Sequence, residues 1–107
     1  MRFQPFLPHP ALAASVDLFW VLEGVPDYTR EKVLPNGALE LILNLGAPHK
    51  VVDPGGFSRF RLYRRSWLAG LQRRFLIIEA TAGSHLVGVR FRPGGFTALF
   101  GLPANEL

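Results

Sequence analysis

Cysteine is absent from the 107 residues, which excludes a disulfide framework, a thiolate metal site and a cysteine nucleophile. Charged residues are also scarce, at 19% of the chain, whereas hydrophobic residues reach 49%. This balance is typical of a globular domain and not of a disordered segment. A chain of this length closes one hydrophobic core, so we expect one domain over residues 1–107.

Long hydrophobic runs are missing as well. Acidic or amide side chains interrupt the most apolar regions, and none approaches the ~20 apolar residues that a membrane-spanning helix needs. The opening segment MRFQPFLPHPALAAS is broken by Pro5, Pro8 and Pro10, which argues against a secretory signal peptide. We therefore expect a cytoplasmic protein with no membrane partner.

Basic charge is unevenly distributed along the chain. The net charge is +4, and six of the twelve basic residues are Arg59, Arg61, Arg64, Arg65, Arg73 and Arg74. Interleaved aromatic residues would let this patch follow a nucleic-acid backbone while the rings stack on bases. The alternatives are a surface that meets another domain and an ordinary solvated face, and the solvated face is favoured.

Alternating and β-branched patterns predict a largely β structure. The expected strands are 16–23, 31–34, 38–45, 57–67, 75–79 and 85–92. In the first of them, Val16, Leu18, Trp20 and Leu22 should share one face. The turn residues Pro35, Asn36 and Gly37 predict that 31–34 and 38–45 form a hairpin.

Glycine and proline mark the rest of the pattern. Gly88, inside a strand, indicates a bulge or a close backbone approach. Phe96, Leu99 and Phe100 have the spacing of a short helix, and a second helix would open at Pro103, so the chain looks cut from something longer. The predicted fold is mainly β, a small antiparallel barrel or sandwich with one or two short helices near the C-terminus.

Trp20, Glu40 and Asn44 are the candidate ligand-binding residues. Glu40 and Asn44 share a strand face, and at a barrel mouth they would hold a polar ligand against Trp20. The favoured alternative is a salt bridge from Glu40 to Arg90 or Arg92, with Asn44 at a strand end.

Arg90 and Arg92 form a second candidate site, for an anion. They precede the PGG sequence at a predicted helix start, where free N–H groups and guanidinium groups would bind negative charge. Charge balancing on a solvated strand face is the alternative.

Metal and nucleophile patterns are weak. His9, His49 and His85 lie far apart, without the close histidine pair of a metal cupin. Ser84 and His85 are neighbours on a strand and point to opposite faces, so they are poorly placed to share a proton. We predict no metal, no cofactor and no enzymatic activity.

Several landmarks occur in order along the chain: LPHPALAASVDLFW, VLPNGALELILNLG, LAGLQRR and VGVRFRPGGFTALFGLPANEL. Together they resemble the N-terminal domain of one group of AraC-type transcriptional regulators. That resemblance implies a cupin-like β domain for effector binding or dimerisation, followed by a C-terminal domain with two helix-turn-helix motifs. The implied partners are a small-molecule effector, a second copy of the chain, and DNA only through the C-terminal domain.

Two other functions stay open from the sequence. One is a stand-alone cupin-like protein that binds a small metabolite or acts on it as a metal-dependent enzyme. The other is a non-specific nucleic-acid binder, whose affinity would fall steeply with salt.

Overall fold

The computed structural model describes residues 2–25, 30–33, 38–53, 55–56, 59–70, 76–79 and 83–102. Its elements, in chain order, are β1 (Arg2–Phe6), the 3-10 helix η1 (Pro10–Leu12), β2 (Val16–Gly24), β3 (Arg30–Val33), β4 (Glu40–Asn44), β5 (His49–Val52), β6 (Phe60–Tyr63), β7 (Ser66–Ala69), β8 (Leu76–Glu79), β9 (Ser84–Phe91) and α1 (Gly95–Phe100). Neither α1 nor any other helix in the described ranges has the length and apolarity to span a bilayer.

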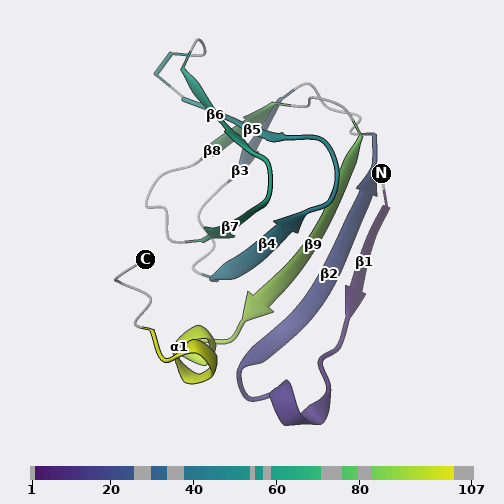
Figure 1. Ribbon diagram of the computed structural model, residues 1–107, viewed down its shortest axis with the longest axis vertical. Helices are drawn as coiled ribbons and strands as arrows, with labels where there is room; N and C mark the ends of the chain where they lie inside the picture. Colours follow the sequence, from purple (N-terminus) through teal and green to yellow (C-terminus); the bar gives the residue numbers. More distant parts are fainter. Residues whose placement is uncertain are drawn as a thin grey trace.

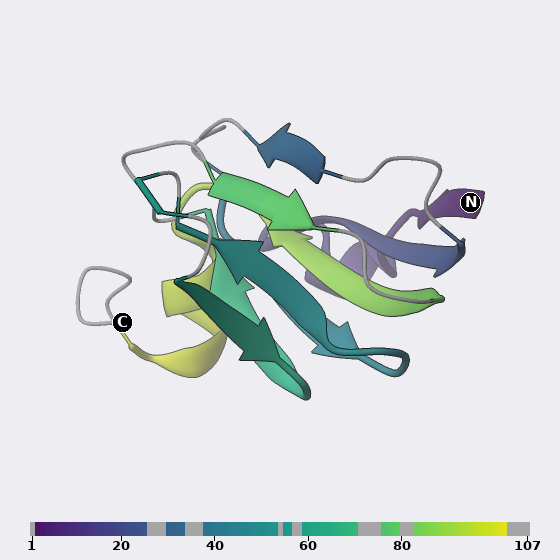
Figure 2. The same ribbon diagram turned by 90° about the horizontal axis from the view of Figure 1, so that it is seen from above.

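The strands form two antiparallel sheets, shown from two sides in Figures 1 and 2. The first sheet has the order β1-β2-β9-β4-β7, and the second has the order β3-β8-β5-β6. From β2 to β9, the chain changes sheet at every connection except the one between β5 and β6. This is the connectivity of a double-sheet jelly roll. The prediction of a mainly β fold with a short helix near the C-terminus is confirmed, and the described strands make two sheets instead of one closed barrel.

The predicted hairpin of 31–34 and 38–45 is wrong. β3 pairs with β8 in the second sheet, whereas β4 pairs with β7 and β9 in the first. Residues 34–37, which include the expected turn, lie outside the described residues. The predicted strand 57–67 is divided in the same way, because the chain changes sheet between β6 and β7.

A long bent hairpin takes the place of those two predictions. β5 pairs with β6 and β4 pairs with β7, so the segment from β4 to β5 runs alongside the segment from β6 to β7. Asn44 stabilises the bend of this hairpin. Its Nδ2 donates to the carbonyl oxygens of Ala47 (2.8 Å) and Tyr63 (3.1 Å), and its Oδ1 accepts from the N–H of Gly46 (2.9 Å).

The core lies on both faces of the first sheet. On one face, Trp20, Ile42 and Leu86 are buried together, with Trp67 packed against them. On the other face, α1 joins the sheet through a cluster of Val16, Phe91 and Phe96. The rings of Phe91 and Phe96 meet edge to face, with 5.5 Å between their centroids. The helix predicted from the spacing of Phe96, Leu99 and Phe100 is confirmed, since α1 covers Gly95–Phe100.

One bulge corrects the predicted face of β2. Val16 pairs with Phe91 and Leu18 with Arg90, so three residues of β2 lie opposite two consecutive residues of β9. Asp17 is the extra residue of this bulge. The bulge therefore moves Val16 to the face opposite Leu18 and Trp20.

Gly88 is explained by close packing. Trp20 pairs with Gly88 across β2 and β9, and a Cβ built at Gly88 would lie closer than 3.0 Å to three atoms of the indole ring. The missing side chain is the space that the Trp20 ring fills.

Near the two ends of the chain, one strand was not predicted, and one predicted helix falls outside the described residues. β1 was not expected, because Pro5 weakens a strand signal; as an edge strand, β1 tolerates a residue without an N–H. The second helix expected from Pro103 lies outside the described residues.

Candidate ligand-binding site

The three residues of the first candidate site share one face of the first sheet. β9 lies between β2, which carries Trp20, and β4, which carries Glu40 and Asn44. Glu40 accepts a hydrogen bond from Arg90 Nε at 2.7 Å, and its side chain is only 15% exposed. The alternative expected for Glu40, a salt bridge to an arginine, is therefore present.

Trp20 and Asn44 have structural contacts of their own. The Trp20 ring is stacked on Phe3 with 5.9 Å between centroids, and its buried Nε1 has no hydrogen-bond partner among the residues that the structure describes. Asn44 is occupied at the bend of the long hairpin. A ligand-binding role for the three residues stays a prediction.

The two arginines of the predicted anion site each have a protein partner. Arg90 pairs with Glu40, and Arg92 Nε donates to the carbonyl oxygen of Ala13 at 2.7 Å. Arg92 also lies 3.8 Å from a carboxylate oxygen of Asp17. Anion binding at this pair stays a prediction, and the Nε of each arginine already donates to a protein oxygen.

The histidines lie at three separate places. His9 caps η1, because its Nδ1 accepts the N–H of Ala11 at 3.0 Å, and His85 lies 4.0 Å from Glu23. His49 lies on β5. In the described part of the chain, no three His, Cys, Asp or Glu side chains are grouped so that they would hold a metal ion.

A row of aromatic side chains crosses the bend of the long hairpin, and the sequence did not reveal it. His49 pairs with Tyr63 across β5 and β6. The Trp67 ring stacks on His49 at 4.9 Å and lies 5.2 Å from the Tyr63 ring. Burial lowers the pKa of His49 from its ordinary value of 6.5, so the imidazole is neutral at physiological pH. We call His49, Tyr63 and Trp67 the aromatic row.

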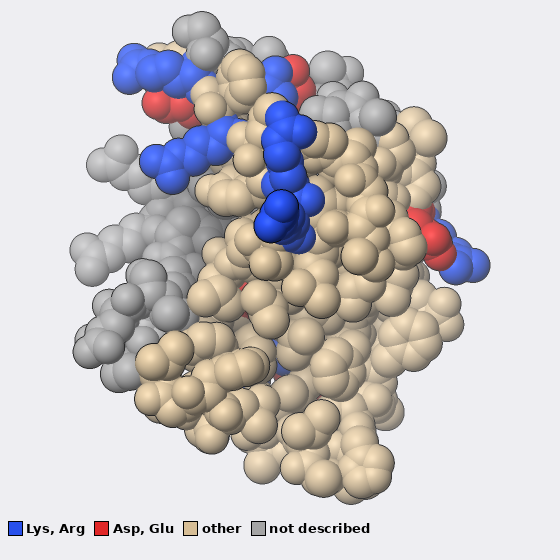
Figure 3. Space-filling view, in the orientation of Figure 1, with Lys and Arg blue, Asp and Glu red and all other residues tan. Residues whose placement is uncertain are grey.

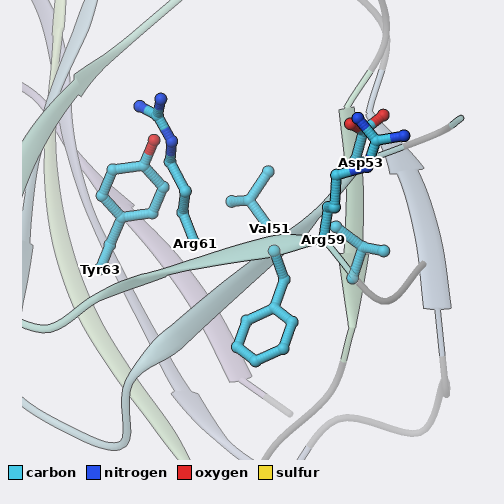
Figure 4. A pocket seen from close by; sticks show the side chains of 7 residues that line it. Val51, Asp53, Arg59, Arg61 and Tyr63 are labelled. Atoms are coloured by element: carbon cyan, nitrogen blue, oxygen red, sulfur yellow. The ribbon is translucent and has the colours of Figure 1, made fainter. Parts of the chain in front are cut away.

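Next to the aromatic row lies an open hollow of about 350 Å³, which we call the β5–β6 hollow. Its lining residues are Val51, Val52, Asp53, Arg59, Phe60, Arg61 and Tyr63. Figure 4 shows Arg61 and Tyr63 side by side, with their polar ends pointing the same way and Val51 beside them. The lining combines apolar side chains with three charged residues and the Tyr63 hydroxyl, and the volume is at the lower end of the ~300–1,000 Å³ range of small-molecule sites.

Positive charge surrounds the hollow. Figure 3 shows Lys and Arg side chains gathered toward the end of the molecule where β5 and β6 lie in Figure 1. Arg59, Arg61, Arg64 and Arg65 are all exposed, and within the described ranges none of the four forms an ion pair. The arrangement suits an anion with an apolar body.

Comparison with known proteins places the chain in a family. No curated protein matches it. Among solved structures, protein NMB1881 from Neisseria meningitidis is similar with a TM-score of 0.52 and 12% identity, over 83% of this chain and 84% of that one. An HTH_3 family transcriptional regulator from Vibrio cholerae is similar with a TM-score of 0.52 and 14% identity, over 85% of this chain but only 50% of that one. At these identities the likeness shows the fold alone. A family model described as a domain of unknown function matches residues 4–107, and the chain therefore belongs to the DUF6597 family.

Proposed function

We propose that this chain is the regulatory domain of an AraC-type bacterial transcription factor, sensing a small molecule or partner and controlling a separate DNA-binding domain. The observation that carries the proposal is the fit of 85% of the chain onto half of the Vibrio cholerae transcriptional regulator. The ordered landmarks from LPHPALAASVDLFW to VGVRFRPGGFTALFGLPANEL support the AraC-type assignment. The jelly-roll strand order supports the cupin-like part, since cupins share that architecture.

A binding role is favoured over catalysis by the contacts of the polar side chains. Glu40 is engaged by Arg90, and Asn44 is engaged by three backbone groups. The β5–β6 hollow, in contrast, combines exposed guanidinium groups with apolar walls, which suits recognition of a ligand. We propose that the domain acts in the cytoplasm, without a cofactor.

Packed side chains connect the hollow with the first sheet. Tyr63 contacts Trp67, and Trp67 packs against the buried cluster of Trp20, Ile42 and Leu86. α1 lies on the opposite face of that sheet. An effector would control a neighbouring domain only if it bound one arrangement of the two domains more tightly than the other.

The test uses the complete gene product. Reading the gene beyond the codon for Leu107 should reveal about 150 further codons with two helix-turn-helix patterns. The intact product should then select a common sequence from fragmented genomic DNA, whereas residues 1–107 alone should select none. A reading frame without such a domain, or an intact product without sequence preference, would refute the proposal.

A second candidate is a stand-alone cupin-like protein that binds a small molecule or acts as a metal-dependent enzyme. It is favoured by NMB1881, where the similar region makes up 84% of the chain, so the fold also occurs without a large additional domain. The same reading of the gene separates the two candidates. Metal analysis of the purified protein then separates a metal enzyme from a binding protein.

A further inference from the structure

We infer that the β5–β6 hollow binds a small organic anion, a carboxylate or phosphate attached to an apolar or aromatic body, with Arg61 as its anchor and Tyr63 as its wall. The inference rests on the proposed function, because it names the class of effector that the domain would sense. It places the ligand on the second sheet, whereas Trp20 and Glu40 lie on the first, and Asn44 contacts the lining through the Tyr63 carbonyl oxygen.

Arg61 is the best placed cation. It stands opposite Val51 in the register of β5 and β6, and Figure 4 shows its guanidinium group beside the Tyr63 hydroxyl. A guanidinium group presents paired N–H donors that match carboxylate and phosphate oxygens, and Tyr63 would add a hydroxyl donor. Both groups belong to one short strand, so their spacing is set by the backbone.

The other charged residues of the hollow are less suited to the role. Asp53 and Arg59 are joined across the turn by a hydrogen bond from the Asp53 N–H to the Arg59 carbonyl oxygen. Asp53 Oδ1 also accepts the N–H of Gly55 at 2.8 Å, which fixes its carboxylate at the turn. An anion near Arg59 would therefore meet a fixed negative charge, whereas Arg61 lies two residues later, on β6.

The walls favour an apolar body on the ligand. On the face that carries Arg61, Val51 lines the hollow, and the Tyr63 ring continues into the aromatic row. Because the neighbouring His49 is neutral at physiological pH, the row adds polarizable ring surface without a second positive charge. An inorganic ion alone would leave these walls unused.

The size of the hollow argues for a metabolite and against a nucleic-acid strand. About 350 Å³ holds one small molecule, whereas a strand needs a groove that continues over several nucleotides. Arg64 and Arg65 lie in the bend between β6 and β7, whereas Arg61 lies on β6. The four arginines therefore do not form one continuous track along a single strand.

The experiment is a titration of the isotope-labelled chain with benzoate and with phenyl phosphate, followed by residue-specific NMR shifts. We expect saturable shifts at His49, Arg61 and Tyr63 and at the indole N–H of Trp67, with a Kd of about 0.1–1 mM for probes this small. The tighter of the two probes distinguishes a carboxylate from a phosphate ligand. Benzamide, which keeps the ring and removes the charge, should bind at least about tenfold more weakly.

Two arginine variants form the matched pair. Arg61→Gln should weaken probe binding about tenfold or more, because a charge-assisted hydrogen bond is lost. Arg64→Gln removes the same charge from an exposed arginine that does not line the hollow, and its effect should stay within about twofold. Tyr63→Phe should weaken binding less than Arg61→Gln and leave the shift pattern in place.

Three results would overturn the inference. They are the absence of saturable shifts up to about 10 mM probe, equal binding of benzamide and benzoate, and equal effects of Arg61→Gln and Arg64→Gln. A short DNA duplex that shifts all four arginines, while the small anions do not saturate, would replace the site with a nucleic-acid surface. If the probes bind but the intact gene product ignores DNA, the site stands and the regulatory role fails; the reverse result removes the site alone.

Discussion

Replacing Gly88 with alanine should be among the most damaging single-methyl changes in this protein. The backbone at Gly88 does not have a positive φ, so the demand for glycine comes from space alone. The added Cβ would lie closer than 3.0 Å to Cε2, Cζ2 and Nε1 of Trp20. That ring is 7% exposed and packed among Ile42 and Leu86, so it has no free direction in which to move. Overpacking of this kind costs about 1–3 kcal/mol, and we expect a loss near 3 kcal/mol.

The size of that loss makes it measurable. A domain of this size is stable by about 5–15 kcal/mol, so Gly88→Ala would remove a large fraction and lower the Tm by about 10 °C or more. Urea unfolding followed by far-UV circular dichroism measures the change. Gly83→Ala is the control, because a Cβ there meets nothing within 4 Å; it should be neutral or stabilise by about 0.4–1 kcal/mol.

A double-mutant cycle then tests the cause. Trp20→Phe removes the indole atoms that the new methyl group would meet, so Gly88→Ala should cost less than about 1 kcal/mol in that background. An equal cost with Trp20 and with Phe at this position would refute the steric reasoning. A cost below about 0.5 kcal/mol in the parent protein would refute it as well.

Three further changes test the bend at Asn44, the ion pair of Glu40 with Arg90, and the buried imidazole of His49. Asn44→Ala should lower the free energy of unfolding by about 2–3 kcal/mol, because three hydrogen bonds at the bend are lost together; a urea titration that shows no loss would contradict this. Glu40→Gln should cost about 1–3 kcal/mol by removing the negative charge that compensates Arg90, whereas Glu23→Gln at an exposed pair should cost under about 1 kcal/mol; equal costs in the same assay would contradict the difference in burial. Because burial lowers the pKa of His49 below the 6.5 of the unfolded chain, the unfolded state binds the proton more readily, and the free energy of unfolding should fall as the pH drops below about 6.5. His49→Phe should remove that part of the pH dependence between pH 7.5 and 5.5, and an unchanged slope would contradict the assignment.

Local patterns in the sequence were enough to predict several elements. The alternation over 16–23 and 85–92 corresponds to β2 and β9, and the β-branched run over 75–79 corresponds to β8. The isolated glycine at position 88 correctly indicated a close approach, although the approaching group is the Trp20 ring instead of a backbone. Each of these features depends on the order of residues within one short segment, or on the small size of one residue, and both can be read directly from the sequence.

Strand pairing could not be predicted from the same patterns. Turn residues at 35–37 indicate that the chain reverses, but they do not indicate which sheet receives the next strand. In this jelly roll, β3 and β4 enter different sheets, so the predicted hairpin failed. The bulge at Asp17 could not be predicted from the sequence either, because it is defined by the register of β2 with β9 and not by the residue pattern of β2 alone.

The aromatic row and the hollow depend on that same long-range pairing. As one straight strand, 57–67 would place Arg59, Arg61, Tyr63 and Arg65 along one solvated face, where no arginine differs from another. The change of sheet between β6 and β7 breaks that equivalence, since it leaves Arg61 and Tyr63 on β6 and brings Trp67 against His49 of β5. Unequal effects of Arg61→Gln and Arg65→Gln on probe binding would therefore report the bend itself, because a straight basic strand places these two arginines on one face and predicts that the two variants behave alike.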